Sequence, residues 1–229
     1  MKEYGFNEND KLYTVEDGKV ELLSDYDDSV HNSICCDCKF ADGASAIHDE
    51  DKIYFIATLR KQSVIRTFDA EGNMETILDR QGSVHTLAKS GNTVYFTGMR
   101  DMGLTECYAF DGNRETKLTS FNDAVMAERS VCPVEEFTFT YKDLELDGYV
   151  IKPVNFDPDR RTCILTIHGG PRAPRSDLST RARYSQMPDI SYSSQTRLEV
   201  TDVEMNSLTL PESTAESTLN AVWRSQMRY

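Results

Sequence analysis

The stretch DKIYFI at residues 51–56 recurs as NTVYFT at residues 92–97, with Tyr54 and Tyr95 separated by 41 residues. Both stretches are rich in the aromatic and β-branched residues that strands favour. A repeat of about 40 residues that contains several short strands is typical of β-propeller blades. The sequence therefore predicts propeller blades, and an unrelated β-sandwich whose hairpins look alike is the alternative that it leaves open.

The rest of each unit repeats in the same order. VIRTFD at residues 64–69 matches ECYAFD at residues 106–111, with an offset of 42 residues. In both units a Gly-Asn turn and a short final strand follow, over 72–78 and 112–119. We expect residues 41–120 to form two consecutive four-stranded antiparallel blades. The two tyrosines, and likewise the two phenylalanines, should lie at equivalent positions, packed between sheets.

Residues 12–23, LYTVEDGKVELL, resemble only the last hairpin of such a blade. The first repeat is therefore incomplete, and we expect a partial β-propeller of about two and a half blades over residues 1–120. An open array of this kind leaves edge strands unpaired. The predicted fold class is mainly β.

The next region is expected to be a connector, over residues 121–135, followed by three strands at 137–141, 146–153 and 163–167. The third strand, CILTI, is a continuous apolar run of the kind that lies buried in a sheet. HGGP follows it directly at residues 168–171. Paired glycines let the backbone turn tightly and approach a ligand closely.

A strand that ends at His-Gly-Gly-Pro is typical of the oxyanion site of an α/β-hydrolase, where backbone N–H groups face the charge that develops on the substrate carbonyl. We therefore predict an oxyanion-site edge at His168, Gly169 and Gly170. The His168 side chain either donates a hydrogen bond there or packs to shape the turn. No Gly-x-Ser-x-Gly nucleophile elbow occurs in the sequence. The other histidines fall in the propeller-like part, so no catalytic triad residue is predicted; they are His31, His48 and His85.

Four stretches carry a further indication: KLTSFN at 117–122, EFTF at 136–139, LDGYVIKP at 146–153 and ILTIHGGP at 164–171. In this order they resemble the prolyl oligopeptidase family, in particular its acylaminoacyl-peptidase and dipeptidyl-aminopeptidase-like members. The resemblance covers residues 10–171. It implies a propeller that caps an α/β-hydrolase domain, which begins here at residues 136–171. It also implies a Ser–Asp–His triad that cleaves peptides or N-blocked peptides through an acyl-enzyme.

The function predicted from this resemblance is a serine-peptidase fragment that is inactive as an isolated chain, because the nucleophile and the triad Asp and His cannot be placed. Two alternatives remain open. One is a non-catalytic module, derived from a propeller, that binds peptides or proteins. The other is a structural subunit whose remaining blades and catalytic half come from another chain.

Residues 172–229 have a different composition, with no Gly, no Lys, seven Arg and sixteen Ser or Thr among 58 residues. A hydrolase core needs Gly at its elbow and tight turns, so we expect a tail of low order outside the family's domain. Its candidate elements are a short strand at 198–203 and a weak helix at 216–227. A shifted reading frame and a divergent C-terminus are both compatible with this composition.

The net charge of −13 argues against a nucleic-acid partner, because such binding needs Lys and Arg. No stretch approaches 18 apolar residues, so no membrane span is predicted. Six cysteines without a signal peptide predict a reducing cytoplasm. Three of them cluster at Cys35, Cys36 and Cys38, but no second Cys/His cluster of suitable spacing follows. We therefore expect no metal and no cofactor, and a peptide as the ligand.

Overall fold

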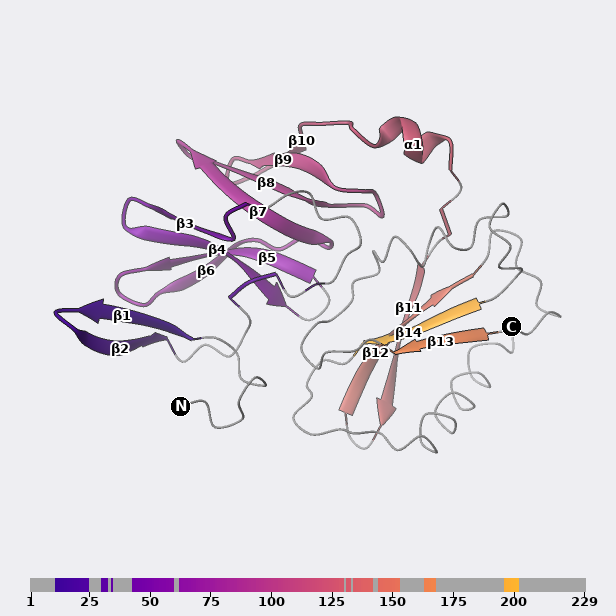
Figure 1. The fold of residues 1–229 in the computed structure, drawn as a ribbon, viewed down its shortest axis with the longest axis horizontal. Helices are drawn as coiled ribbons and strands as arrows, with labels where there is room; N and C mark the ends of the chain where they lie inside the picture. Colours follow the sequence, from indigo (N-terminus) through magenta and orange to yellow (C-terminus); the bar gives the residue numbers. More distant parts are fainter. Residues whose placement is uncertain are drawn as a thin grey trace.

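The computed structural model describes residues 11–24, 30–32, 34, 43–59, 62–129, 131–132, 134–141, 144–152, 163–167 and 196–201. Within these ranges the protein consists mainly of β-strands. The strands form a hairpin, two blades and a mixed sheet (Figure 1).

The first blade is a four-stranded antiparallel sheet in sequential order, with strands β3 (Ala46–Asp49), β4 (Lys52–Leu59), β5 (Gln62–Asp69) and β6 (Met74–Leu78). The second blade has the same order, with strands β7 (Ser83–Ser90), β8 (Thr93–Met99), β9 (Glu106–Phe110) and β10 (Glu115–Lys117). The prediction of two consecutive four-stranded blades is confirmed. The final strand of the second blade ends two residues earlier than predicted.

The repeated aromatic residues occupy equivalent strands. Tyr54 and Tyr95 lie in the second strand of their blades, and Phe68 and Phe110 lie in the third. Both phenylalanines are buried, but Tyr95 is 38% exposed. The expectation that both tyrosines pack between sheets is therefore wrong for Tyr95. Tyr54 packs against a cluster shared with the second blade, whereas Tyr95 belongs to no hydrophobic cluster of the described residues.

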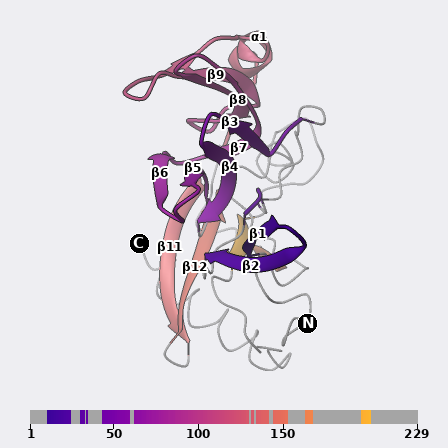
Figure 2. The same ribbon diagram turned by 90° about the vertical axis from the view of Figure 1, so that its left-hand side faces the viewer.

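The hairpin at the N-terminal side of the stack consists of β1 (Leu12–Glu16) and β2 (Lys19–Ser24). Asp17 and Gly18 join the strands with φ of 48° and 76°. Positive φ at both central positions defines the turn whose twist suits a two-residue hairpin, and Asp-Gly is a favoured pair there. This confirms the predicted hairpin over residues 12–23. Figures 1 and 2 show it on the opposite side of the first blade from the second blade.

The main core lies between the two blades. It is formed by the buried side chains of Ile56, Ile65, Leu78, Val84, Leu87, Val94, Phe96, Tyr108 and Phe110. Strand alternation explains why one face of each strand supplies these residues. Phe96 and Tyr108 stack, with ring centroids 5.2 Å apart. Full burial of one such side chain stabilises the fold by about 1.5–3 kcal/mol, so this interface holds the blades together.

The predicted connector contains a short helix, α1 (Asp123–Ala127), that the sequence did not indicate. Beyond it lies a sheet of four strands, β11 (Val134–Tyr141), β12 (Leu144–Ile151), β13 (Cys163–Ile167) and β14 (Thr196–Thr201). Their order is β11-β12-β14-β13. β11 and β12 pair antiparallel over their whole length, with Phe137 opposite Gly148. A Cβ atom on Gly148 would lie 2.3 Å from the outer end of the Phe137 ring, so a larger residue would displace this ring.

Of the tail, the structure describes only β14, and the expectation of low order for residues 172–195 and 202–229 stays a prediction. Thr196–Thr201 pairs antiparallel with β12 and parallel with β13, and so lies in the interior of the sheet. The predicted strand at 198–203 was displaced by two residues. The segment TRLEVT alternates polar and apolar residues, which is enough to join strands that would otherwise present open edges. A parallel pair requires a long crossover, and residues 168–195 form the connection here.

Candidate functional site

The strand that was predicted to lead into the oxyanion motif is present as β13, which ends at Ile167. His168, Gly169 and Gly170 follow it directly in the sequence but lie outside the described residues. Their role at an oxyanion site therefore stays a prediction. The predicted helix at 216–227 also lies outside the described part.

The remaining histidines do not form a triad with the described residues. His31 and His48 are exposed, and His85 is buried in β7. His85 Nε2 lies 2.8 Å from Ser83 Oγ, which is the distance expected for a nucleophile and its base. Ser83, however, is fully buried. A substrate cannot reach this hydroxyl, so the pair is a structural contact.

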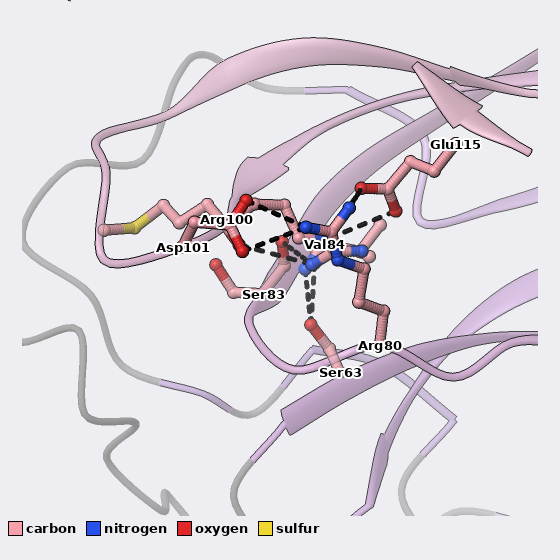
Figure 3. Close-up of polar contacts among 8 residues, drawn as sticks. Ser63, Arg80, Ser83, Val84, Arg100, Asp101 and Glu115 are labelled. Carbon is pink, nitrogen blue, oxygen red and sulfur yellow. Dashed lines mark hydrogen bonds and ion pairs between the residues drawn. The ribbon is translucent and has the colours of Figure 1, made fainter. Parts of the chain in front are cut away.

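A group of ion-paired side chains in the second blade and the connection before it centres on Arg100 (Figure 3). The Arg100 and Glu115 side chains are only 1% and 6% exposed. Arg100 Nε donates to the two carboxylate oxygens of Glu115 at 3.3 and 3.2 Å, and Nη1 donates to the carbonyl oxygens of Ser83 and Met99 at 3.2 Å. The guanidinium carbon also lies 5.1 Å from the centre of the Phe96 ring. Arg100 is thus packed against the aromatic core as well as paired.

Arg80 extends this group to the surface. It follows β6 and therefore belongs to the connection between the two blades. Its Nη1 donates to Glu115 Oε1 at 2.7 Å, and its Nη2 donates to the Asp101 carboxylate oxygens at 2.9 and 2.8 Å. Asp101 is largely exposed. One carboxylate, that of Glu115, is therefore shared by two arginines.

The electrostatics of this group follow from its burial. Burial lowers the pKa of Arg100, and the positive charge of nearby Arg80 lowers it further. The negative charge of Glu115 raises the pKa of Arg100 but does not outweigh burial. Burial likewise raises the pKa of Tyr108 to about 12. Arg100 Nη2 is buried and has no hydrogen-bond partner among the described residues. A charge this deep needs its partner carboxylate. Because the partners lie in the second blade and Arg80 lies in the connection that leads to it, we assign the group a role in stabilising the second blade and not in binding substrate.

A second polar anchor lies where the chain leaves the second blade. The Glu106 carboxylate accepts hydrogen bonds from the Asn122 backbone N–H at 2.8 Å, the Asn122 side-chain amide at 3.1 Å and the Phe121 N–H at 3.1 Å. The Thr119 hydroxyl donates to the same carboxylate. Asn122 also donates to the carbonyl oxygen of Thr105 at 2.8 Å. Glu106 thereby fixes the segment that leads to α1.

Burial alone would raise the pKa of Glu106. The hydrogen bonds from Thr119, Asn122 and Phe121 favour the charged form and outweigh burial, so the pKa lies below its usual value. The carboxylate therefore stays ionised at neutral pH and acts as the acceptor for the connector. It determines the direction in which the chain continues toward β11.

Sequence reasoning did not find these charged residues. Two of them, Arg100 and Glu106, do carry a sequence signal. Arg100 falls on the same strand face as Val94, Phe96 and Gly98, because every second residue of a strand faces the same side. Glu106 likewise falls on the face of Tyr108 and Phe110. A charged residue on the apolar face of a strand indicates a buried charge with a partner. The partners cannot be identified this way, because Arg80 and Glu115 are 35 residues apart.

We find no group of three or more His, Cys, Asp or Glu residues that could hold a metal ion among the described residues. The cysteine cluster Cys35, Cys36 and Cys38 lies outside them. Cys107 is a free thiol. In the part of the chain that the structure covers, no helix is long and apolar enough to cross a bilayer.

Stacked four-stranded antiparallel blades followed by a mixed sheet place the protein in the class of β-propeller proteins with a second, appended sheet. No family model matches the sequence, and no curated protein matches it. Solved structures of peptidases do share the fold. The acylaminoacyl peptidase of Pyrococcus horikoshii matches 85% of the chain with 21% identity and a TM-score of 0.61.

Two further structures are similar over 85% of the chain. An acylaminoacyl peptidase in complex with Z-Gly-Gly-Phe-chloromethyl ketone has 22% identity and a TM-score of 0.64. Dipeptidyl peptidase 4 of Porphyromonas gingivalis has 16% identity and a TM-score of 0.57. The chain spans 28% of the length of each of these three proteins. At these identities the likeness is one of fold.

Proposed function

We propose that this chain is part of a serine peptidase of the prolyl oligopeptidase family. In this proposal residues 1–120 supply two and a half blades of the propeller, residues 121–135 form the connector, and residues 136–171 begin the α/β-hydrolase domain. The similarity in fold to two solved acylaminoacyl peptidase structures supports the assignment. The substrates are peptides or N-blocked peptides, which is consistent with the blocked peptide inhibitor in one of the similar structures.

The observation that carries the proposal is the sheet that follows the blades. An antiparallel pair, β11 and β12, is joined to a parallel pair, β14 and β13, and β13 runs directly into His168, Gly169 and Gly170. Parallel pairs with long crossovers are the building units of α/β folds. A glycine-rich turn after such a strand is where a hydrolase places the N–H groups of its oxyanion site.

In the mechanism we propose, the backbone N–H groups near Gly169 and Gly170 donate to the carbonyl oxygen of the scissile bond as it becomes an oxyanion. Donors held at fixed positions stabilise this charge more than water does, because they need no reorganisation during the reaction. His168 borders this site. The serine nucleophile, the base and its aspartate are not among the residues of this chain, so the chain contributes the oxyanion edge and the propeller.

The isolated chain should therefore have no peptidase or esterase activity. The N–H groups of an oxyanion site accelerate hydrolysis little when the nucleophile and its base are missing. Purified protein should hydrolyse acyl-peptide and prolyl chromogenic substrates no faster than buffer alone does. Turnover that a serine-directed fluorophosphonate abolishes would show that a nucleophile is present and that the assignment of parts is wrong.

The family assignment is tested at the genomic locus. A Gly-x-Ser-x-Gly motif encoded in another reading frame, within about 100 codons downstream, would support the family assignment. The corrected longer chain should then cleave an acetyl-peptide anilide and lose this activity with a fluorophosphonate. Unrelated downstream sequence would instead favour the second candidate, a propeller-derived module that binds a peptide or protein without chemistry. The uncovered face around Tyr95, which is 38% exposed, favours that candidate.

We also propose a reducing, cytoplasmic location. The free thiol of Cys107 supports it, because oxidising compartments favour paired cysteines. A thiol-labelling assay on protein recovered under non-reducing conditions tests this, and a disulfide at Cys107 would contradict it.

A further inference from the structure

The turn of the hairpin leaves a carboxylate and the next backbone nitrogen open to reaction. Asp17 and Gly18 form this turn, and both are exposed. A Cβ atom on Gly18 would meet nothing within 4 Å, so the space around the turn is open. Among the described residues, none forms a hydrogen bond or an ion pair with the Asp17 carboxylate. The hairpin contacts the first blade through Leu12 and Leu23, at the end away from the turn.

An Asp that precedes Gly can react with its own backbone, because Gly has no Cβ atom to hinder the approach of its nitrogen. The Gly18 nitrogen forms a bond to Cγ of the protonated Asp17 carboxyl group. The bond from Cγ to the hydroxyl oxygen breaks, and the hydroxyl leaves as water with the N–H proton. The product is a five-membered succinimide ring, and the step needs no oxidant or reductant.

Water then opens the ring at one of its two carbonyl carbons. Addition of water at Cγ restores Asp. Addition at the former backbone carbonyl gives isoaspartate, in which the main chain runs through Cβ and Cγ and the α-carboxylate is free. Either outcome places one oxygen atom from the solvent in the residue, and the sum of the two steps is an isomerisation.

The second blade contains the same dipeptide in a protected form. Asp111 and Gly112 are exposed like the hairpin turn. However, Asp111 Oδ1 accepts hydrogen bonds from the backbone N–H groups of Arg114 at 2.8 Å and Asn113 at 2.9 Å. These bonds lower the pKa of Asp111, so its carboxyl group is ionised and cannot lose its hydroxyl as water. They also hold the carboxylate in place, which opposes its rotation toward the Gly112 nitrogen.

A third Asp-Gly pair, Asp147 and Gly148, lies in β12. Asp147 is opposite Thr138 of β11 and Thr201 of β14, so its backbone is paired on both sides. Ring closure requires the backbone to leave the extended conformation, and both ladders oppose this. In the fourth pair, Asp42 lies outside the described residues. Of the three pairs that the structure describes, the hairpin turn is therefore the least protected.

We propose that Asp17 is a modification site, at which the chain isomerises through a succinimide to isoaspartate. The change has a structural consequence, because the main chain becomes one carbon atom longer inside a two-residue turn. That turn requires positive φ at both central positions and sets Glu16 opposite Lys19. Isoaspartate at residue 17 should break this register and loosen the hairpin. The site depends only on the turn and holds whether or not the chain is part of a peptidase.

Incubation of the folded chain in isotope-labelled water tests the site, because each passage through the succinimide introduces one heavy oxygen atom. Trypsin digestion in ordinary water gives residues 12–19 and 101–114 as separate peptides, and mass spectrometry locates the label. Residues 12–19 should gain label at least about tenfold faster than 101–114, a ratio that corresponds to about 1.4 kcal/mol in activation free energy. A carboxyl methyltransferase that is specific for isoaspartate should transfer methyl groups from S-adenosylmethionine to the same peptide.

Two controls separate the structure from the local sequence. In concentrated urea the two peptides should gain label at similar rates, because the hydrogen bonds to Asp111 are lost. Asp17→Glu keeps the charge but cannot close a five-membered ring, so label and methylation in residues 12–19 should stop, with the fold checked by circular dichroism. Equal rates in the folded chain, or a difference that persists in urea, would overturn the proposal. So would label or methylation in residues 12–19 that Asp17→Glu leaves unchanged, or a folded chain that gains none there.

Discussion

Arg100 Nε lies 3.2 Å from Glu115 Oε2, and both side chains of this second-blade ion pair are almost completely buried. Attraction between buried charges is strong, but removing them from water costs a comparable amount of free energy. The net effect of the pair on stability is therefore small, whereas the loss of one partner leaves a buried charge unpaired. Arg80 donates to the same carboxylate at 2.7 Å, so two arginines depend on Glu115.

The first prediction concerns this carboxylate. Glu115→Gln should lower the free energy of unfolding by about 3–5 kcal/mol, because the buried Arg100 loses its counter-ion. The urea midpoint of purified protein measures the loss. In the double variant Arg100→Met with Glu115→Leu, apolar side chains replace both charges, and much of the stability should return.

Asp101→Asn is the control for this prediction. Asp101 also pairs with Arg80, but its side chain is 78% exposed. An exposed pair contributes about 0–1 kcal/mol, so this variant should be nearly neutral. Equal losses for the Glu115 and Asp101 variants would show that Glu115 is not buried.

The second prediction is a pH dependence that Glu106 produces. Its pKa in the folded protein lies below the usual value of 4.5, because Thr119, Asn122 and Phe121 donate to the carboxylate and outweigh the effect of burial. The stabilising contribution is therefore complete above about pH 4.5 and is lost as the pH falls through the lower folded value. Glu106→Gln should weaken the loss of stability below pH 4.5, measured as urea midpoints at a series of pH values.

Hydrogen exchange provides a local measure of the same anchor. The amide protons of Phe121 and Asn122 should exchange faster in Glu106→Gln, because the acceptor is no longer charged. Asp111→Asn is the comparison, since Asp111 accepts hydrogen bonds from Asn113 and Arg114 in its own turn and not from the connector. Unchanged exchange at Phe121 and Asn122 in the Glu106 variant would contradict the anchor.

The repeated strands were predictable from the sequence because their aromatic and β-branched residues recur at a fixed offset and carry local information. The hairpin turn at Asp17 and Gly18 was predictable for the same reason, since the turn chemistry lies in two adjacent residues. The exposure of Tyr95 could not be predicted from the sequence, because it depends on whether a further blade lies beside this residue. Equivalent positions in a repeat have equal surroundings only inside the array.

The charged groups and β14 could not be predicted for a different reason. Glu115 meets Arg80 and Arg100 only after the strands of the second blade have paired and the connection before it has folded back, and spacing along the chain does not encode such a contact. β14 is a short polar-apolar alternation in a segment poor in apolar residues, and its place between β12 and β13 comes from unpaired strand edges. The oxyanion-site residues predicted after β13 lie outside the described residues, so that prediction stays open to the experiments above.

The third prediction uses two adjacent residues on opposite faces of β8. Phe96 is 3% exposed in the core between the blades, and Tyr95 is 38% exposed. Phe96→Ala should lower the free energy of unfolding by about 3–5 kcal/mol, because it leaves a cavity beside Tyr108. Tyr95→Ala should cost less than about 0.5 kcal/mol when both are measured by urea denaturation. Similar costs for the two would contradict the assignment of faces.

The last prediction tests the strand that the tail contributes. The backbone of Leu198 lies opposite Val150 of β12 and Leu165 of β13, in the interior of the sheet. Proline lacks the N–H group that a central strand uses, so Leu198→Pro should detach β14 from its neighbours. Thr196→Pro is the matched control, because proline is tolerated at the first residue of a strand. Hydrogen exchange read by mass spectrometry should show faster exchange over Cys163–Ile167 in the Leu198 variant and little change in the Thr196 variant. If neither variant alters exchange in β13, then Thr196–Thr201 does not complete the sheet in solution, and the expectation of a tail outside the domain regains its support.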